Sequence, residues 1–262
     1  MANVKGISKV AQNSVQDPDT WSLAQFNLRH IQIVFAPAKS DFVPLLINSS
    51  IASAGHLGDY IVPPATTSAF QVHVFRQTDG VQLVAAGKQL QVDIEIPSDQ
   101  REPTKALSYA TSRFKRLGRQ ILPVVGKDAD WLGVICTYMR KLSASKPIEE
   151  ILLEFLDSNG FPLKEGQQPI AFQRVVGFRE NGWNCNRRLE GYQTHQGVFA
   201  PEVAQMDVGL FPIIESGIQF ITDVNDRSIG KRASVGKKMQ AAIDVNLKHA
   251  SLWLDTELEA LK

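Results

Sequence analysis

Hydrophobic and polar residues alternate with two different periods along the chain. In residues 89–96, four aliphatic residues alternate with Gln91, Asp93 and Glu95. A period of two, bounded by turn sequences such as Thr78-Asp79-Gly80, is typical of antiparallel strands with one solvated face. The same reasoning predicts a strand over 26–35 and a three-stranded meander over 70–96.

A second alternating region, residues 170–190, surrounds Asn181-Gly182. Asn-Gly is the preferred centre of a two-residue hairpin turn, because both central residues need positive φ. This turn sets Glu180 opposite Trp183, Phe178 opposite Cys185, Val176 opposite Arg187 and Arg174 opposite Leu189. We expect an apolar face, directed at the core, that carries Phe172, Val176, Phe178, Trp183, Cys185 and Leu189. The other face is polar, and we interpret it as solvated; the alternative is a recognition surface for phosphate, carboxylate or a partner formed by Arg179, Arg188, Asn184 and Asn186.

Apolar residues at helical spacing occupy the middle and the end of the chain. Their pattern predicts helices over 104–117, ending at Gly118, over 128–142, and from Pro147 to Asn159. The longest helical pattern covers 234–261, where one stripe contains Met239, Ile243, Leu247, Ala250, Leu254, Leu258 and Leu261. We expect this stripe to dock on the sheet, with pairing to a second copy of the chain as the alternative.

The order of strands, helices, strands and a final helix predicts an α+β fold rather than a doubly wound parallel sheet. We expect an N-terminal antiparallel β-meander, a helical middle segment, and a C-terminal β-hairpin region closed by a long amphipathic helix. Residues 1–20 are polar and aperiodic and are expected to form an arm. Residues 21–262 form one domain, divisible into a β-rich lobe (21–100), a helical lobe (101–165) and a hairpin-plus-helix lobe (166–262). Within it we also expect an edge strand over 42–47, a polar loop over 191–197, a helical turn over 201–206, and strands over 210–214 and 217–224.

The charge balance restricts how the chain could bind nucleic acid. The 262 residues include 28 Lys and Arg against 27 Asp and Glu, so the chain as a whole is not a polycation. Two local basic segments remain, residues 113–119 and 231–238. We predict that they contact nucleic acid, against the alternative of an ordinary solvated surface, through Arg113, Arg116, Arg119, Lys231, Arg232, Lys237 and Lys238.

The cysteines and the N-terminal residues bear on metal binding and location. Cys136 and Cys185 are the two cysteines, and no CxxC pair is present. We therefore expect buried free thiols, no zinc site and no cofactor. The N-terminal residues lack the apolar core of a secretory signal, and no apolar run approaches a membrane span. These patterns favour a cytoplasmic protein with no membrane contact.

None of the common catalytic motifs occurs in the chain, including GxxxxGK[ST], GxGxxG, GxSxG and HExxH. The predicted function is therefore a non-catalytic binding or assembly protein that self-associates, with the final helix as a candidate contact and nucleic acid as a candidate partner. The rival hypothesis is a hydrolytic, nuclease-like enzyme centred on His195 with Arg188 and Glu190.

Overall fold

A computed structural model describes residues 21–38, 60–61, 73–77, 80–143, 147–158, 163–167, 169, 171–196, 211–227 and 232–259. The strands are β1 (Asn27–Pro37), β2 (Tyr60–Ile61), β3 (His73–Gln77), β4 (Val81–Ala86), β5 (Gln89–Glu95), β6 (Asp128–Ser143), β7 (Gln173–Glu180), β8 (Trp183–His195), β9 (Ile213–Asn225) and β10 (Ala233–Ser234). The α-helices are α2 (Pro103–Val125), α3 (Ile148–Ser158) and α4 (Val235–Glu259), and two short 3-10 helices are η1 (Leu23–Gln25) and η3 (Ser98–Gln100).

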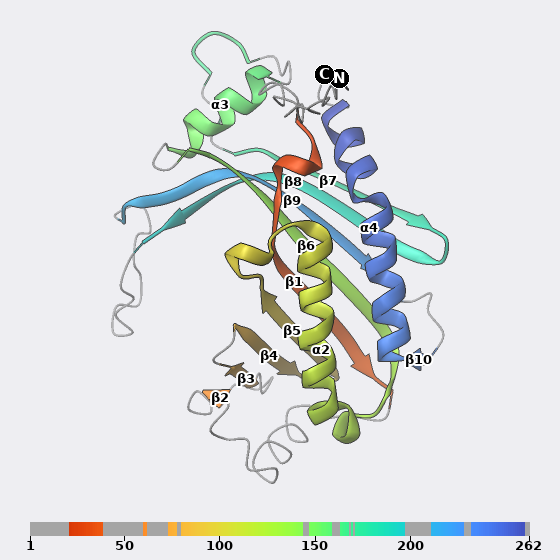
Figure 1. Cartoon of the computed structure of the whole chain (residues 1–262). Coiled ribbons are helices and arrows are strands. Elements are labelled where there is room, and N and C mark those ends of the chain that lie inside the picture. Colours follow the sequence, from red (N-terminus) through yellow and green to blue (C-terminus); the bar gives the residue numbers. More distant parts are fainter. Residues whose placement is uncertain are drawn as a thin grey trace, which may run out of the picture.

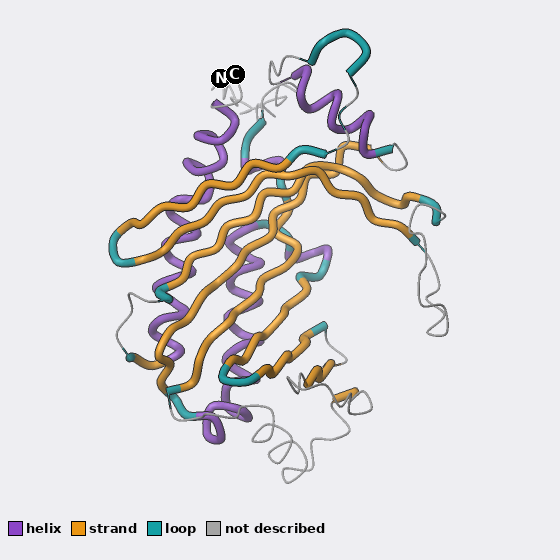
Figure 2. Tube along the Cα trace, turned by 180° about the vertical axis from the view of Figure 1, so that it is seen from behind, coloured by secondary structure: helices purple, strands orange, loops and turns teal. Residues whose placement is uncertain are grey.

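All ten strands belong to one antiparallel sheet, which confirms the α+β class. The strand order is β2-β3-β4-β5-β1-β6-β9-β8-β7, and β10 pairs with β6. Helices α2 and α4 lie side by side across one face of the sheet (Figure 1). Seen from behind, the strands lie in front of the helices, and no described helix covers this open face of the sheet (Figure 2). This single sheet takes strands from all three of the lobes outlined above.

The hairpin has the predicted turn and register. Asn181 and Gly182 have φ values of 50° and 82°, as a two-residue turn requires. Phe178 pairs with Cys185, and Arg174 pairs with Leu189. Cys185 and Leu189 are fully buried on the helix side. The meander of β3, β4 and β5 is also confirmed, and its inward residues Leu90, Val92 and Ile94 are buried.

The helix predicted over 128–142 is wrong, because this segment is the central strand β6. The predicted helical stripe ended at Leu142; its other three members, Trp131, Ile135 and Met139, recur every four positions, and a spacing of four also fits a period of two. In the strand they share the open face of the sheet. The residues buried under the helices are the alternate ones, listed here: Leu132, Val134, Cys136 and Tyr138.

Helix α2 extends eight residues beyond the predicted end at Leu117, to Val125. It begins as expected, because the Glu102 carboxylate accepts hydrogen bonds from the backbone amides of Thr104 and Lys105, both at 3.1 Å. Gly118 is not the stop: it lies inside the helix on a crowded side, where an added Cβ would lie 3.2 Å from Leu122. The helix ends instead at Gly126, whose φ of 100° disfavours any residue with a side chain.

Two other predictions are corrected in the last third of the sheet. The loop expected over 191–197 is strand up to His195, because β8 continues to pair with β9. The strands expected over 210–214 and 217–224 are one strand, β9. Gly217 does not interrupt it: an added Cβ would lie 2.1 Å from the carbonyl oxygen of Arg140 on β6, so glycine permits close approach of the two backbones.

Helix α4 docks on the sheet, as expected for its apolar stripe. Met239, Ile243, Ala250, Leu254 and Leu258 are buried, whereas Leu247 is 43% exposed. The expectations for residues 1–20, 42–47, 70–72, 78–79 and 201–206, for Leu210, and for Lys231 and Leu261, lie outside the described residues. No helix in the described part of the chain is both long enough and apolar enough to cross a membrane.

A candidate anion-binding groove between two helices

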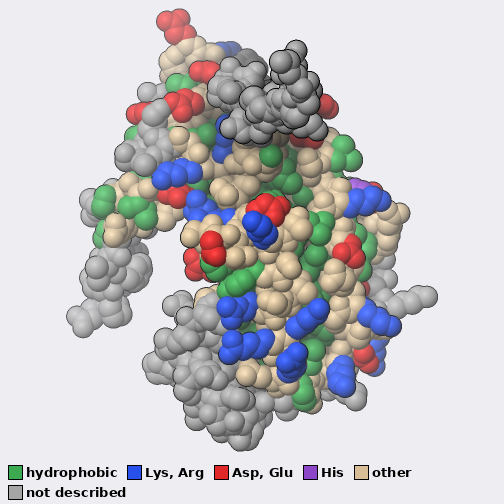
Figure 3. Space-filling model, in the orientation of Figure 1, with side chains coloured by type: hydrophobic (Ala, Val, Ile, Leu, Met, Phe, Trp, Pro, Cys, Tyr) green, Lys and Arg blue, Asp and Glu red, His purple; other side chains and the backbone are tan. Residues whose placement is uncertain are grey.

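The two basic segments of the sequence meet in one groove between α2 and α4. The groove has a volume of about 640 Å³. One wall is the second half of α2, the other is Ser234 with the first two turns of α4, and Lys127 also lines the groove. Lysine and arginine side chains gather over α2 and the beginning of α4 on this face of the molecule (Figure 3).

Four cations line this groove above an apolar floor. The cations are Lys115, Arg119, Lys127 and Lys237, and the floor includes Phe114 and Met239. No carboxylate is among the described residues that line the groove. None of the four cations forms an ion pair with another described residue. The groove therefore concentrates positive charge that has no internal partner, which attracts polyanions over a distance of about one Debye length.

The beginning of α4 adds to this potential. The first turn of the helix contains no acidic residue. Its first amide, that of Val235, donates to the carbonyl of Lys127 at 2.9 Å, which holds the helix end against the groove. The positive end of the helix dipole therefore points into the same region as the four cations.

The other predicted nucleic-acid contacts divide into surface and interior residues. Arg113 lies on α2 with its guanidinium 4.9 Å from the ring of Tyr109, and Arg116 is exposed on the same helix. Arg232 is exposed, but its Nε is hydrogen bonded to Asp130 at 3.0 Å. Lys238 is an interior residue with a side chain 6% exposed, and it pairs with Asp226. We therefore leave Lys238 out of the binding surface.

From the sequence, Lys115 and Lys127 could have been identified as groove residues only because they lie within or near the basic segment 113–119. Lys115 lies within segment 113–119, and Lys127 follows α2. What the sequence could not show is that α4 would return to the end of α2, because that contact joins residues more than a hundred positions apart.

The residues of the rival catalytic hypothesis are not brought together. Arg188 and Glu190 are neighbours on one side of β8, with 3.3 Å between Nε and Oε1. Glu190 also accepts hydrogen bonds from Gln173 and Gln219, at 2.8 and 2.6 Å. His195 lies five residues further along the strand, a distance of about 16 Å, and its Nδ1 contacts the carbonyl of Phe211 at 2.9 Å. His195 is therefore too far from Arg188 and Glu190 to act with them on a shared reacting atom.

The thiols are buried, as the sequence predicted. Burial raises the pKa of Cys136 to about 12 and that of Cys185 to about 11. Thiolates are the reactive form. We therefore expect neither cysteine of the folded protein to react with Ellman's reagent at pH 8, and both to react in urea. Rapid labelling of either thiol under native conditions would contradict this burial.

No group of three or more His, Cys, Asp or Glu side chains within the described ranges is arranged to hold a metal ion. Comparison with known proteins adds no family: no protein-family model matches the chain, and no curated protein matches its sequence.

Proposed function

We propose that the chain is a non-catalytic binding protein that holds the phosphate backbone of nucleic acid in the groove between α2 and α4. The observation that carries the proposal is the convergence of two distant basic segments on one groove. Four cations without acidic partners match the repeated phosphates of a nucleic-acid strand. None of the described side chains that line the groove is an exposed aromatic one, so the expected binding is independent of base sequence.

Self-association remains part of the proposal, with a revised contact. The apolar stripe of α4 is occupied by the sheet, so a second copy would meet the outer side of the helix, where Leu247 and Leu252 are exposed. The reducing cytoplasm is the proposed location, and two widely separated free thiols are compatible with it.

Binding of a fluorescent single-stranded RNA should weaken steeply as salt increases. Each neutralised phosphate contributes about 0.7 to the slope of log K against log salt, so four contacts give a slope of about −2.8. The double variant R119Q/K237Q should lower the magnitude of that slope by about 1.4. Fluorescence anisotropy over a range of salt concentrations measures both values.

The matched control is K164Q/K248Q, which removes the same charge at two exposed lysines outside the groove. It should leave the slope unchanged. Equal losses in the two double variants would show that net charge, rather than the groove, is responsible, and salt-independent binding would overturn the proposal.

A further inference from the structure

The open face of the sheet carries a second hollow, unrelated to the basic groove. It has a volume of about 570 Å³, within the range of small-molecule sites. Two rows of side chains, each running across strands β1, β6, β9, β8 and β7, form its base. The first row is Val34, Gly133, Asn225, Asn184 and Arg179, and the second is Gln32, Ile135, Asp223, Asn186 and Gly177, of which Gln32 lies beyond the lining of the hollow.

Glycine makes room in each row. An added Cβ on Gly133 would lie 2.9 Å from the Cβ of Asn225, and one on Gly177 would lie 2.7 Å from Oδ1 of Asn186. At Gly133, between Val34 and Asn225, no side chain therefore covers the backbone of β6. A flat ligand can lie on this surface with the aliphatic side chains of Val34 and Ile135 against it.

The amide side chains hold Asp223 in a fixed orientation. Asn225 donates to both carboxylate oxygens of Asp223, at 3.1 and 3.2 Å, and Asn186 donates to Oδ2 at 3.3 Å. The amide nitrogen of Asn184 donates to Oδ1 of Asn225 at 3.2 Å. Oδ1 of Asn184 in turn accepts a hydrogen bond from Nε of Arg179 at 3.2 Å. The bonds to Asp223 use three of the roughly four lone-pair sites of its carboxylate, but each is longer than the usual 2.9–3.0 Å, so a ligand with stronger donors can displace Asn225 from it.

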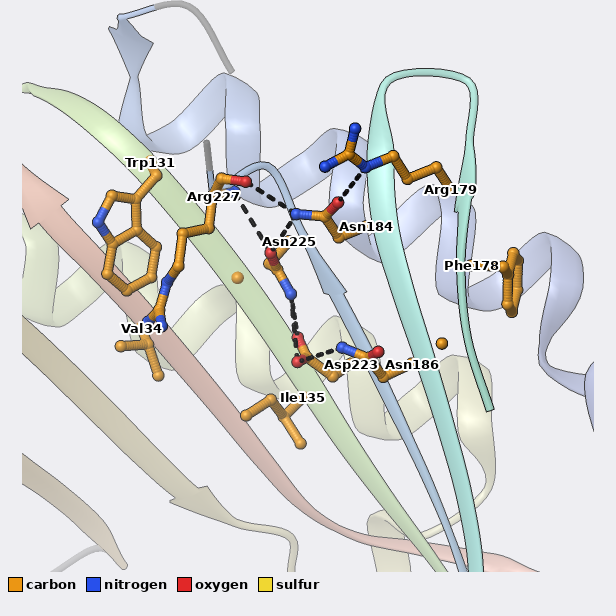
Figure 4. A pocket seen from close by; sticks show the side chains of 12 residues that line it. Val34, Trp131, Ile135, Phe178, Arg179, Asn184, Asn186, Asp223, Asn225 and Arg227 are labelled. Atoms are coloured by element: carbon orange, nitrogen blue, oxygen red, sulfur yellow. Dashed lines mark hydrogen bonds between the residues drawn. The ribbon is translucent and has the colours of Figure 1, made fainter. Parts of the chain in front are cut away.

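Opposite charges face each other across the hollow without pairing. Arg227 lies beside Trp131, with its guanidinium 4.1 Å from the ring, on the side opposite Asp223 and Asn225 (Figure 4). Neither Asp223 nor Arg227 forms an ion pair with another described residue. A ligand that satisfies both must present hydrogen-bond donors at one edge and an anionic group elsewhere.

We propose that this hollow binds a guanine nucleotide. Guanine is the nucleobase with two adjacent donors, N1–H and the 2-amino group, and these would replace the long bonds from Asn225 to the two oxygens of Asp223. The planar base would lie over Gly133, and Arg227 would contact the phosphate. The nucleotide is either free or an unpaired guanine of RNA, and both have the same recognition chemistry.

Isothermal titration with GMP, IMP, AMP and guanosine tests the base. GMP should bind at least tenfold more tightly than IMP, which lacks the 2-amino group, and than AMP, because a site built around two donors rejects analogues that lack them. D223N should weaken GMP binding at least tenfold. R227Q should weaken binding of GMP but not of guanosine. The control E95Q changes an exposed carboxylate elsewhere on the open face and should bind like the original protein.

Oligouridylate with and without one central guanosine distinguishes the two sources of the nucleotide. The measurement uses the R119Q/K237Q background, in which the basic groove keeps only two of its four cations, and oligouridylate without guanosine measures the binding that remains there. Preference for the guanosine oligonucleotide identifies RNA, whereas binding of GMP alone identifies a free nucleotide. GMP bound no more tightly than AMP, or D223N binding like the original protein with an unchanged thermal midpoint, would overturn the proposal.

Discussion

Replacing Glu257 with glutamine should lower the free energy of unfolding by about 3 to 5 kcal/mol. Glu257 lies on α4 with 1% of its side chain exposed. Its two carboxylate oxygens form ion pairs with Arg174 of β7 and Arg187 of β8. The triad therefore joins the last helix to the hairpin, and the neutral amide would leave two guanidinium groups beneath α4 without their counter-charge.

Urea denaturation measures this change, with E259Q as the control. Glu259 lies two residues along the same helix but is exposed, so its replacement should change the unfolding free energy by less than about 0.5 kcal/mol. R174Q should cost less than E257Q, because Arg174 is 37% exposed and Arg187 would still neutralise Glu257. A loss in E257Q no greater than that in E259Q would show that the triad does not stabilise the protein.

Replacing Lys238 with methionine should have a similar cost, about 3 to 5 kcal/mol. The ammonium group pairs with Asp226 and also donates to the carbonyl of Asp130 at 3.2 Å. Asp226 is 6% exposed, and its other oxygen accepts from the amide of Leu132 at 2.7 Å. Methionine fills nearly the same volume but leaves a buried carboxylate without a cation.

Lys237 provides the matched control for this substitution, because it is adjacent in sequence and exposed. K237M should leave the unfolding free energy nearly unchanged. The double variant D226N/K238M removes both buried charges while an amide oxygen can still accept from Leu132, so it should be more stable than K238M alone. Additive losses in the double variant would rule out a direct interaction between the two side chains.

The sequence predicted best those elements whose geometry depends on neighbouring residues. The hairpin register follows from Asn181-Gly182 alone, and the meander follows from strict alternation closed by short turns. Both patterns depend on local backbone geometry, so they predict these elements correctly without knowledge of the tertiary contacts. The same reasoning paired Arg174 with Leu189 and Arg187 with Val176, although it could not identify the partner of the two arginines on α4.

The failures share a cause, which is dependence on distant contacts. Residues 128–142 satisfy both helical and strand spacing, and the two long strands that flank β6 decide between them. Lys238 resembles Lys237 in sequence, and only the position of Asp226 separates an interior residue from a surface one. The hollow on the open face needs five strands in register, a condition that no single segment of the chain reveals.

The central position of β1 has a consequence for the order of folding. This strand pairs on one side with β5 and on the other with β6, whose partner residues follow about a hundred positions later. During synthesis, the edge of β1 that pairs with β6 therefore lacks its partner strand until residues 128–143 have been made. Because closing long chain segments slows folding, the β1–β6 pairing is the step at which an incomplete chain is most exposed to pairing with its neighbours.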